Sequence, residues 1–190
     1  MREKIRAILN QREKRQIIDL DAVPSAVLVP IFEKDGEDHI LFTKRTDTVE
    51  HHKGQISFPG GKRNIEDETL LHTALRESFE EVGIRPEDVD VLGDLDDEKT
   101  LVSNYIVSPY VGMIPYPYHF KTSPDEVQGL LEVPISSLLD KNNLREEFET
   151  SGSVRYRAYY FYYGEDIIWG ATSRILKRFF DLICAGGEAG

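Results

Sequence analysis

The chain has 190 residues, 40% of them hydrophobic, so we expect a single domain, residues 1–190, with a sizeable core. Its 34 acidic and 23 basic residues give a formal net charge of −11, which argues against broad nucleic-acid binding, where a basic face is expected. The single cysteine excludes an intrachain disulfide and a cysteine-based zinc site. No apolar run is as long as a membrane span and no signal-peptide pattern opens the chain, so we expect a soluble, cytoplasmic protein without membrane partners.

Hydrophobic periodicity and turn residues predict the elements in chain order. Charged residues with spaced apolar ones indicate an N-terminal helix within residues 1–20. Apolar and β-branched runs bounded by turn residues predict strands at 25–32, 39–44, 89–95, 103–114, 126–133 and 154–163. Further helices are predicted at 68–83, 135–139 and 170–183, and a flexible tail at 186–190. This order favours an α/β fold with a mixed sheet packed between helices.

The predicted helix at 68–83 is the most informative segment. Residues three and four apart share one face of a helix, so Glu77, Glu80 and Glu81 project the same way. Neighbouring carboxylates repel one another unless a cation lies among them, and Mg²⁺ or Mn²⁺ takes oxygen ligands. Mg²⁺ usually combines few protein carboxylates with phosphate oxygens of a substrate. The segment therefore predicts a metal-assisted enzyme acting on a phosphate ester or anhydride.

Other residues of the segment lie at positions that would support such a site. An apolar stripe is predicted to pack inward at Leu71, Leu75, Phe79 and Val82. Arg76 lies four residues before Glu80 and is expected to orient a carboxylate, while Gly83 is expected to end the helix. The Gly60–Gly61 pair lets the backbone approach a ligand closely. A solvated acidic helix would explain the glutamates alone, but not this combination.

This segment resembles the Nudix box, G-x5-E-x7-R-E-U-x-E-E-x-G-U, where U is a bulky aliphatic residue. The matching residues are Glu68, Arg76, Glu77, Glu80, Glu81, Gly83 and Ile84. The chain departs from the pattern by one extra residue in the glycine loop and by Ser78 at the first aliphatic position, which is expected to cost some packing. The resemblance implies a Nudix-type α/β/α sandwich in which the backbone carbonyl of Gly60 joins Glu77, Glu80 and Glu81 as a ligand of Mg²⁺ or Mn²⁺.

Residues just upstream resemble the signature of the coenzyme A pyrophosphatase branch of the Nudix hydrolases, roughly L-L-T-x-R-S-x6-H-x-G-x-I-x-F-P-G-G. The matching residues are Thr43, Arg45, His52, Gly54, Ile56, Phe58, Pro59, Gly60 and Gly61. Both departures from the general box are frequent in this branch, although some of its members carry arginine where Glu50 stands. The resemblance implies hydrolysis of CoA or acyl-CoA at the diphosphate, giving 3′-phospho-AMP and a 4′-phosphopantetheine.

Basic residues around the glycine loop predict phosphate binding, at Arg45, His52, Lys53, Lys62 and Arg63. His52 could instead be a structural loop residue. The general base stays open between a glutamate of the box and Glu126, which could also be a solvated turn residue. The acidic run at 96–98 is expected on a loop surface. The aromatic residues at 156–163 are expected mainly in a strand core, with an adenine-stacking platform as the alternative.

The predicted partner is a small nucleotide-containing diphosphate, and the resemblance implies a homodimer. Two alternatives remain open for the substrate and the activity. One is hydrolysis of another nucleoside diphosphate derivative, such as ADP-ribose or NADH, or of a nucleoside triphosphate. The other is a catalytically inactive Nudix-fold binding module, and a structural adaptor that uses the N-terminal helix is a third reading.

Overall fold

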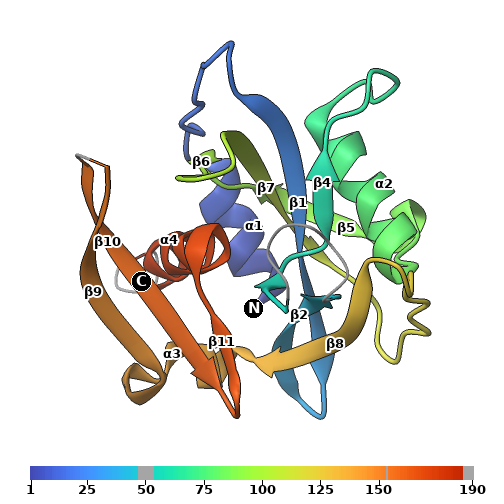
Figure 1. Cartoon of the computed structure of the whole chain (residues 1–190). Coiled ribbons are helices and arrows are strands. Elements are labelled where there is room, and N and C mark those ends of the chain that lie inside the picture. Colours follow the sequence, from blue (N-terminus) through green and yellow to red (C-terminus); the bar gives the residue numbers. More distant parts are fainter. Residues whose placement is uncertain (47–53, 153, 186–190) are drawn as a thin grey trace.

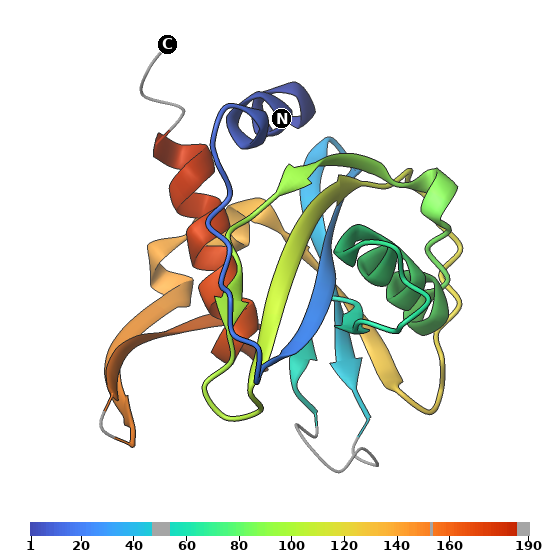
Figure 2. The same cartoon turned by 90° about the horizontal axis from the view of Figure 1, so that it is seen from above.

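The computed structural model describes residues 1–46, 54–152 and 154–185. A mixed sheet lies between α2 (Leu70–Val82) on one side and α1 (Arg2–Asn10) and α4 (Gly170–Ala185) on the other (Figures 1 and 2). This arrangement confirms the predicted α/β/α layers. Among the described residues, none of the helices has the length and apolar character needed to cross a membrane.

The central sheet is mixed because one of its pairings is parallel. β1 (Val23–Lys34) pairs in parallel with β7 (Tyr105–Met113) over nine residue pairs, and the other pairings are antiparallel. The strand order is β3-β2-β1-β7-β5, where the other three strands are β2 (Glu37–Arg45), β3 (Ile56–Ser57) and β5 (Asp90–Asp94). Shorter pairings add β4 (Gly60–Lys62) to β1, β6 (Glu98–Lys99) to β7 and β8 (Val127–Pro134) to β2. The central pair β1 and β7 lies between the helices on the two faces of the sheet (Figures 1 and 2).

A second sheet, which the sequence did not predict, packs beside α4. Its strands, in the order β11-β10-β9, are β9 (Leu144–Ser151), β10 (Val154–Tyr163) and β11 (Asp166–Ile168). β10 was predicted from its aromatic and β-branched residues, whereas β9 reads LREEFETS and lacks a buried face. The short helix α3 (Ile135–Leu139) and two 3-10 turns (Pro86–Asp88 and Lys141–Asn143) connect the elements. Phe161 of β10 packs against Phe180 of α4, which joins this sheet to the main core.

The N-terminal helix is shorter than predicted. α1 ends at Asn10, and residues 11–22 form a non-helical arm along the edge of the sheet. Arg12 forms an ion pair with Asp96, and Lys14 Nζ lies 2.9 Å from Asp97 Oδ1. The backbone N–H of Ile17 also donates to Asp97 Oδ2 at 3.0 Å. These contacts hold the arm in place of the helical turns that we predicted for this segment.

The acidic run at 96–98 is largely buried, so its predicted place on a loop surface was wrong. Asp97 and Glu98 are 5% and 7% exposed. Asp97 also accepts a hydrogen bond from Ser108 Oγ at 2.6 Å, and Glu98 pairs with Arg174 at 2.5 Å and with Arg178 at 3.1 Å. Because their charges are paired, these residues connect the arm and α4 to the sheet.

Candidate active site

α2 packs against β1 and β4 through small side chains. Ala74 and Ser78 have no exposed surface, and Ser78 Oγ donates to the Ala74 carbonyl at 2.7 Å. Of the predicted inward stripe, Val82 is buried, and Leu71 and Leu75 are half-buried. The prediction was wrong for Phe79, which is 52% exposed. Ser78 therefore fits the packing instead of weakening it. Small residues let the helix lie close to the sheet, and this closeness brings its glutamates to the glycine loop.

Both ends of α2 follow local rules that the sequence displays. Thr69 precedes the helix, and its side chain accepts a hydrogen bond from the His72 backbone N–H at 3.1 Å. Gly83 adopts the left-handed conformation with φ of 75°, and its N–H donates to Phe79 O at 2.9 Å. The predicted helix end at Gly83 is confirmed, and the glutamates lie in the last two turns.

The glycine loop lies so close to β1 and to Glu77 that neither glycine has room for a side chain. The Gly60 N–H donates to Glu81 Oε2 at 3.2 Å. Gly60 has φ of +153°, and a Cβ there would lie 2.6 Å from Val27 Cα. A Cβ on Gly61 would lie 2.5 Å from Glu77 Oε2. The glycines therefore lie against β1 and the Glu77 carboxylate, and the predicted close approach of the backbone to a ligand stays a prediction.

Two of the glutamates are withdrawn from solvent. Glu81 is 6% exposed, and burial raises its pKa to about 8, although the Gly60 N–H and the Arg45 charge act in the opposite direction. Burial also raises the pKa of Glu77, against the opposing effect of Arg76. Glu80 lies at the outer edge, with its side chain 55% exposed. The charged forms of Glu77 and Glu81 are thus disfavoured in the protein alone.

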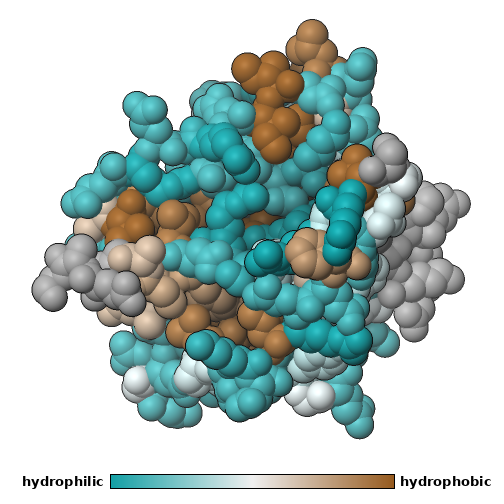
Figure 3. Space-filling model, turned by 90° about the vertical axis from the view of Figure 1, so that its left-hand side faces the viewer, coloured by the Kyte–Doolittle hydropathy of each residue, from teal (hydrophilic) through white to brown (hydrophobic). Residues whose placement is uncertain are grey.

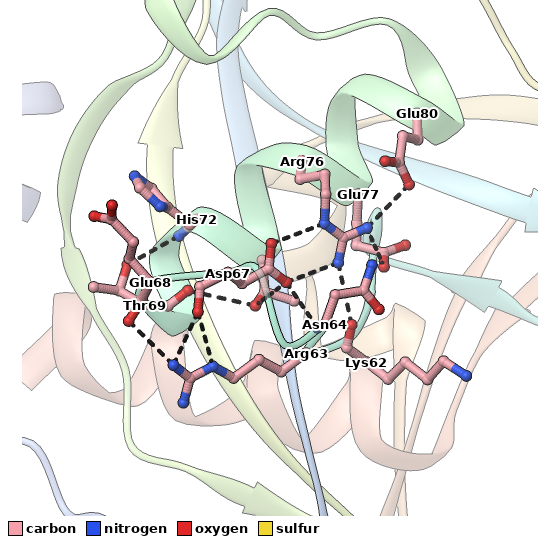
Figure 4. A network of polar contacts seen from close by, with 11 residues as sticks. Lys62, Arg63, Asn64, Asp67, Glu68, Thr69, His72, Arg76, Glu77 and Glu80 are labelled. Carbon is pink, nitrogen blue, oxygen red and sulfur yellow. Dashed lines mark hydrogen bonds and ion pairs between the residues drawn. The ribbon is translucent and has the colours of Figure 1, made fainter.

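Arg76 lies at the centre of a polar network beside these glutamates (Figure 4). Its Nε and Nη2 each donate to Asp67 at 2.9 Å, while Nη1 donates to Glu77 at 2.8 Å and to Glu80 at 3.0 Å. Asp67, which the sequence analysis missed, is buried, and Arg76 holds the pKa of its carboxyl well below the ordinary value. Glu68, the match to the first glutamate of the box, is exposed. Asp67 therefore holds Arg76 in place, and Arg76 is the residue that we expected to orient the glutamates.

The predicted cationic residues have different surroundings. Arg45 ends β2, and its buried Nε has no hydrogen-bond partner among the residues that the structure describes. Lys62 is exposed beside the glycine loop. Arg63 instead donates to the carbonyls of Asp67 and Glu68, at 2.9 and 3.1 Å from Nη2, and does not line the cavity described below (Figure 4). Its predicted substrate contact is therefore not supported. His52 and Lys53 lie outside the described residues.

Glu126, from a loop distant in sequence, is brought to the same place. Its backbone carbonyl accepts from the Thr46 N–H at 3.1 Å, and the neighbouring Ser123 N–H donates to the Glu81 carbonyl at 2.9 Å. The charge of Glu126 contributes to the raised pKa values of Glu77 and Glu81, so these three carboxylates face one region. Glu126 is also an exposed turn residue directly before β8, as the solvated-turn reading expects, so its role as a base stays a prediction.

A cavity of about 840 Å³ extends from these residues across the molecule. One wall consists of the glycine loop, the glutamates of α2, Arg45 and Glu126, and the opposite wall includes β9, β10 and the first turn of α4. Figure 1 shows α2 and the β9–β10 hairpin on opposite sides of the molecule. Aromatic residues line the second wall at Tyr156, Tyr159, Tyr160 and Trp169. The cavity is therefore larger than a diphosphate alone requires.

The carboxylates fit a hard divalent cation. Glu77 and Glu81 are oxygen donors whose charges are desolvated and further disfavoured by Glu126, a situation that a bound cation reverses. Without a side chain at Gly61, the Glu77 carboxylate lies against the backbone of the glycine loop. No group of three acidic, histidine or cysteine side chains within the described ranges converges on one point; Arg76 holds Glu77 and Glu80 directly. The donor chemistry fits Mg²⁺ or Mn²⁺.

Comparisons with known proteins place the chain in a family. The NUDIX domain model matches residues 22–150. The chain is 38% identical over 154 residues to a Yersinia enterocolitica protein named "Uncharacterized Nudix hydrolase NudL", covering 81% of this chain and 78% of that protein. A Yersinia pestis protein of the same name is 37% identical, with 81% and 76% covered. The crystal structure of MutT protein from Methanosarcina mazei Go1 has a TM-score of 0.54 at 20% identity, covering 93% of this chain and 99% of that chain, which shows the shared fold.

The chain therefore belongs to the Nudix hydrolases, a family of pyrophosphohydrolases that generally use divalent metal ions. This result confirms the predicted fold and enzyme class. The names of the relatives identify no substrate, so the coenzyme A branch stays a prediction.

Proposed function

We propose that this protein hydrolyses the diphosphate bond of CoA or acyl-CoA, in the presence of Mg²⁺ or Mn²⁺, to 3′-phospho-AMP and (acyl-)4′-phosphopantetheine. The observation that carries the proposal is the buried Glu81, held by the Gly60 N–H beside Arg45, whose Nε is buried without a partner among the described residues. A cation among the carboxylates and a phosphate oxygen at Arg45 would satisfy both groups. The branch signature upstream of the glycine loop supports CoA as the substrate.

The carboxylates of Glu77, Glu80 and Glu81, with the Gly60 carbonyl, would hold the metal. When bound, the metal neutralises charge on the diphosphate and lowers the pKa of a water molecule. Arg76 keeps Glu77 and Glu80 in position through its ion pairs. The Arg45 guanidinium and the Lys62 ammonium bind non-bridging phosphate oxygens.

Glu126 is the residue that we assign as general base, accepting a proton from the attacking water at a carboxylate oxygen. The assignment is supported by its place in the cavity wall and by its electrostatic effect on Glu77 and Glu81. Glu126→Gln is expected to lower kcat by about 10²- to 10⁴-fold. Metal affinity, measured by calorimetry, should change little, and an unchanged kcat would return the role to a glutamate of the box.

The test of the function is turnover of a substrate panel with Mg²⁺ or Mn²⁺. CoA and acetyl-CoA should be cleaved with a higher kcat/KM than ADP-ribose, NADH or a nucleoside triphosphate. Glu81→Gln should lower kcat by at least ~10³-fold while the protein stays folded, because charge stabilisation at the diphosphate is lost. Glu87→Gln, an exposed residue outside the cavity, is the matched control.

Higher kcat/KM on ADP-ribose would replace the CoA assignment with the broader nucleoside diphosphate class. Failure to cleave any member of the panel would favour a Nudix-fold binding module without catalysis. A cytoplasmic location and a homodimer remain predictions, and size-exclusion chromatography with light scattering would test the second.

A further inference from the structure

The two ends of the cavity differ in charge. At the glycine-loop end, Arg45 and Lys62 line the cavity, and no ion pair of either with another described residue is seen; Glu77, Glu80, Glu81 and Glu126 line the same end, and the metal of the proposed function would offset their charge. At the opposite end the cationic lining residue is Arg174, whose Nε lies 2.5 Å from Glu98 Oε1. Nη2 of Arg174 also donates to the Lys99 carbonyl at 3.4 Å. The positive charge at the far end is therefore already neutralised.

A carboxylate and two phenols form the far end, on β9 and β10. Glu149 accepts a hydrogen bond from Tyr156 Oη at 2.6 Å and another from the Tyr160 hydroxyl. These two hydrogen bonds lower the pKa of Glu149, which stays ionised near neutral pH. A further anion placed here would meet the negative charge of Glu149 without a free cation among the described lining residues. The far end therefore disfavours a phosphate group.

Apolar surface continues this wall on the turn between β6 and β7. Leu101 and Val102 line the cavity and are 40% and 86% exposed. The turn is held by Thr100, whose Oγ1 accepts from the Tyr105 N–H at 2.8 Å and from Ser103 Oγ at 3.0 Å. Figure 3, viewed from the left-hand side of Figure 1, shows hydrophobic side chains in separate patches on a mainly hydrophilic face. The turn thus offers a local apolar contact beside the aromatic wall.

CoA has two unlike arms on either side of its diphosphate. One arm is adenosine with a doubly charged 3′-phosphate, and the other is a neutral chain with two amides that ends in a thiol or thioester. We propose that the far end, defined by Glu149, Tyr156, Tyr160 and the turn at 100–103, binds the neutral pantetheine arm and its acyl group. The 3′-phosphoadenosine arm then lies at the glycine-loop end, on the other side of the diphosphate that Arg45 and Lys62 bind. This assignment rests on the proposed function, because it presumes that CoA is the substrate.

The orientation follows from charge and from hydrogen-bonding capacity. Glu149 and the two tyrosine hydroxyls can exchange hydrogen bonds with amide groups, and the rings cover the methylene carbons of the arm. Leu101 and Val102 would contact an acyl chain that extends beyond the thioester. The reverse orientation would bring the 3′-phosphate toward Glu149, where the lining cation, Arg174, is already paired with Glu98.

Calorimetric titration with the two product halves, in the presence of Mg²⁺, tests the orientation. Tyr160→Ala is expected to weaken binding of 4′-phosphopantetheine at least ~10-fold, as for a buried aromatic contact, and to leave binding of 3′-phospho-AMP within about twofold. Tyr156→Ala should act in the same direction and serves if Tyr160→Ala does not fold. The matched control is Tyr162→Ala, on the same strand but outside the cavity lining.

CoA turnover by the parent protein is measured first, so that two kinds of failure can be told apart. If the parent does not cleave CoA, the proposed function is overturned and the assignment falls with it. If the parent cleaves CoA, weaker binding of 3′-phospho-AMP in the tyrosine variants, or no change in either titration, overturns the orientation alone. A selective loss of 4′-phosphopantetheine binding supports it.

Discussion

Asp67→Asn tests whether the buried aspartate, which the sequence did not identify, supports the active-site helix. Asp67 accepts two hydrogen bonds from Arg76 and one each from Thr73 Oγ1 and the Asn64 N–H, all at 2.9 Å. Removing one partner of a buried ion pair costs about 3–5 kcal/mol. Arg76 is 24% exposed and keeps its ion pairs with Glu77 and Glu80 in the variant. We therefore expect a smaller loss in the free energy of unfolding, about 2–3 kcal/mol.

The assay is urea unfolding of the metal-free protein, with kcat for CoA measured in parallel. The expected loss corresponds to a fall in Tm of roughly 5–10 °C for a chain of this size. The kcat should fall as well, because Arg76 without Asp67 holds Glu77 less rigidly. Glu68→Gln, one residue away and exposed, should change the free energy of unfolding by less than about 0.5 kcal/mol.

The pH dependence gives a second check on the same residue. Because Arg76 lowers the pKa of Asp67, the stability from the ionised aspartate is fully present above its ordinary pKa of 3.8 and is lost as the pH falls below it. The difference between the parent and Asp67→Asn should therefore shrink in acid. A larger loss from Glu68→Gln than from Asp67→Asn, or a constant difference at all pH values, would refute the reasoning.

Two further predictions concern the glutamates. Because burial raises the pKa of Glu81 from 4.5 to about 8, the metal-free protein should lose stability as the pH rises through this range. Glu81→Gln should flatten that dependence. Tm values of both proteins measured in EDTA at several pH values test this prediction, and equal slopes of Tm against pH would contradict it. Gly61→Ala places a Cβ 2.5 Å from Glu77 Oε2 and should lower kcat about 10²-fold, whereas Gly129→Ala, with no atom within 4 Å of its Cβ, should be near the parent.

The sequence predicted the parts of the fold that follow from local rules. The strands β1, β2 and β10 have apolar or β-branched runs, and α2 ends at a glycine whose φ of 75° only a few residue types adopt readily. The second sheet was missed because β9 is largely charged and exposed, so no alternation of buried and exposed apolar residues marks it. The non-helical arm was missed because its ion pairs and hydrogen bonds join residues about 80 positions apart.

Within the site, spacing predicted which residues share a helix face, but it did not predict burial. Glu77, Glu80 and Glu81 have the same sequence signal, yet their side chains range from buried to 55% exposed. Asp67 and Glu68 are adjacent acids, and only the folded loop shows which one reaches Arg76. The proximity of Glu126 also depends on a loop whose docking on α2 is a tertiary contact.

The error about the inner face of α2 explains how the site is built. A helix that buried Leu75 and Phe79 would be held away from the sheet by the width of those side chains, and Glu81 would reach solvent. Burying Ala74 and Ser78 instead brings the helix axis close to β1 and β4, where the Gly60 N–H meets Glu81. The desolvation that raises the pKa of Glu81 is thus a consequence of small residues on the inner face. A bound cation would offset the unfavourable desolvation of the Glu81 carboxylate. Folding and metal binding therefore depend on the same close contact between helix and loop.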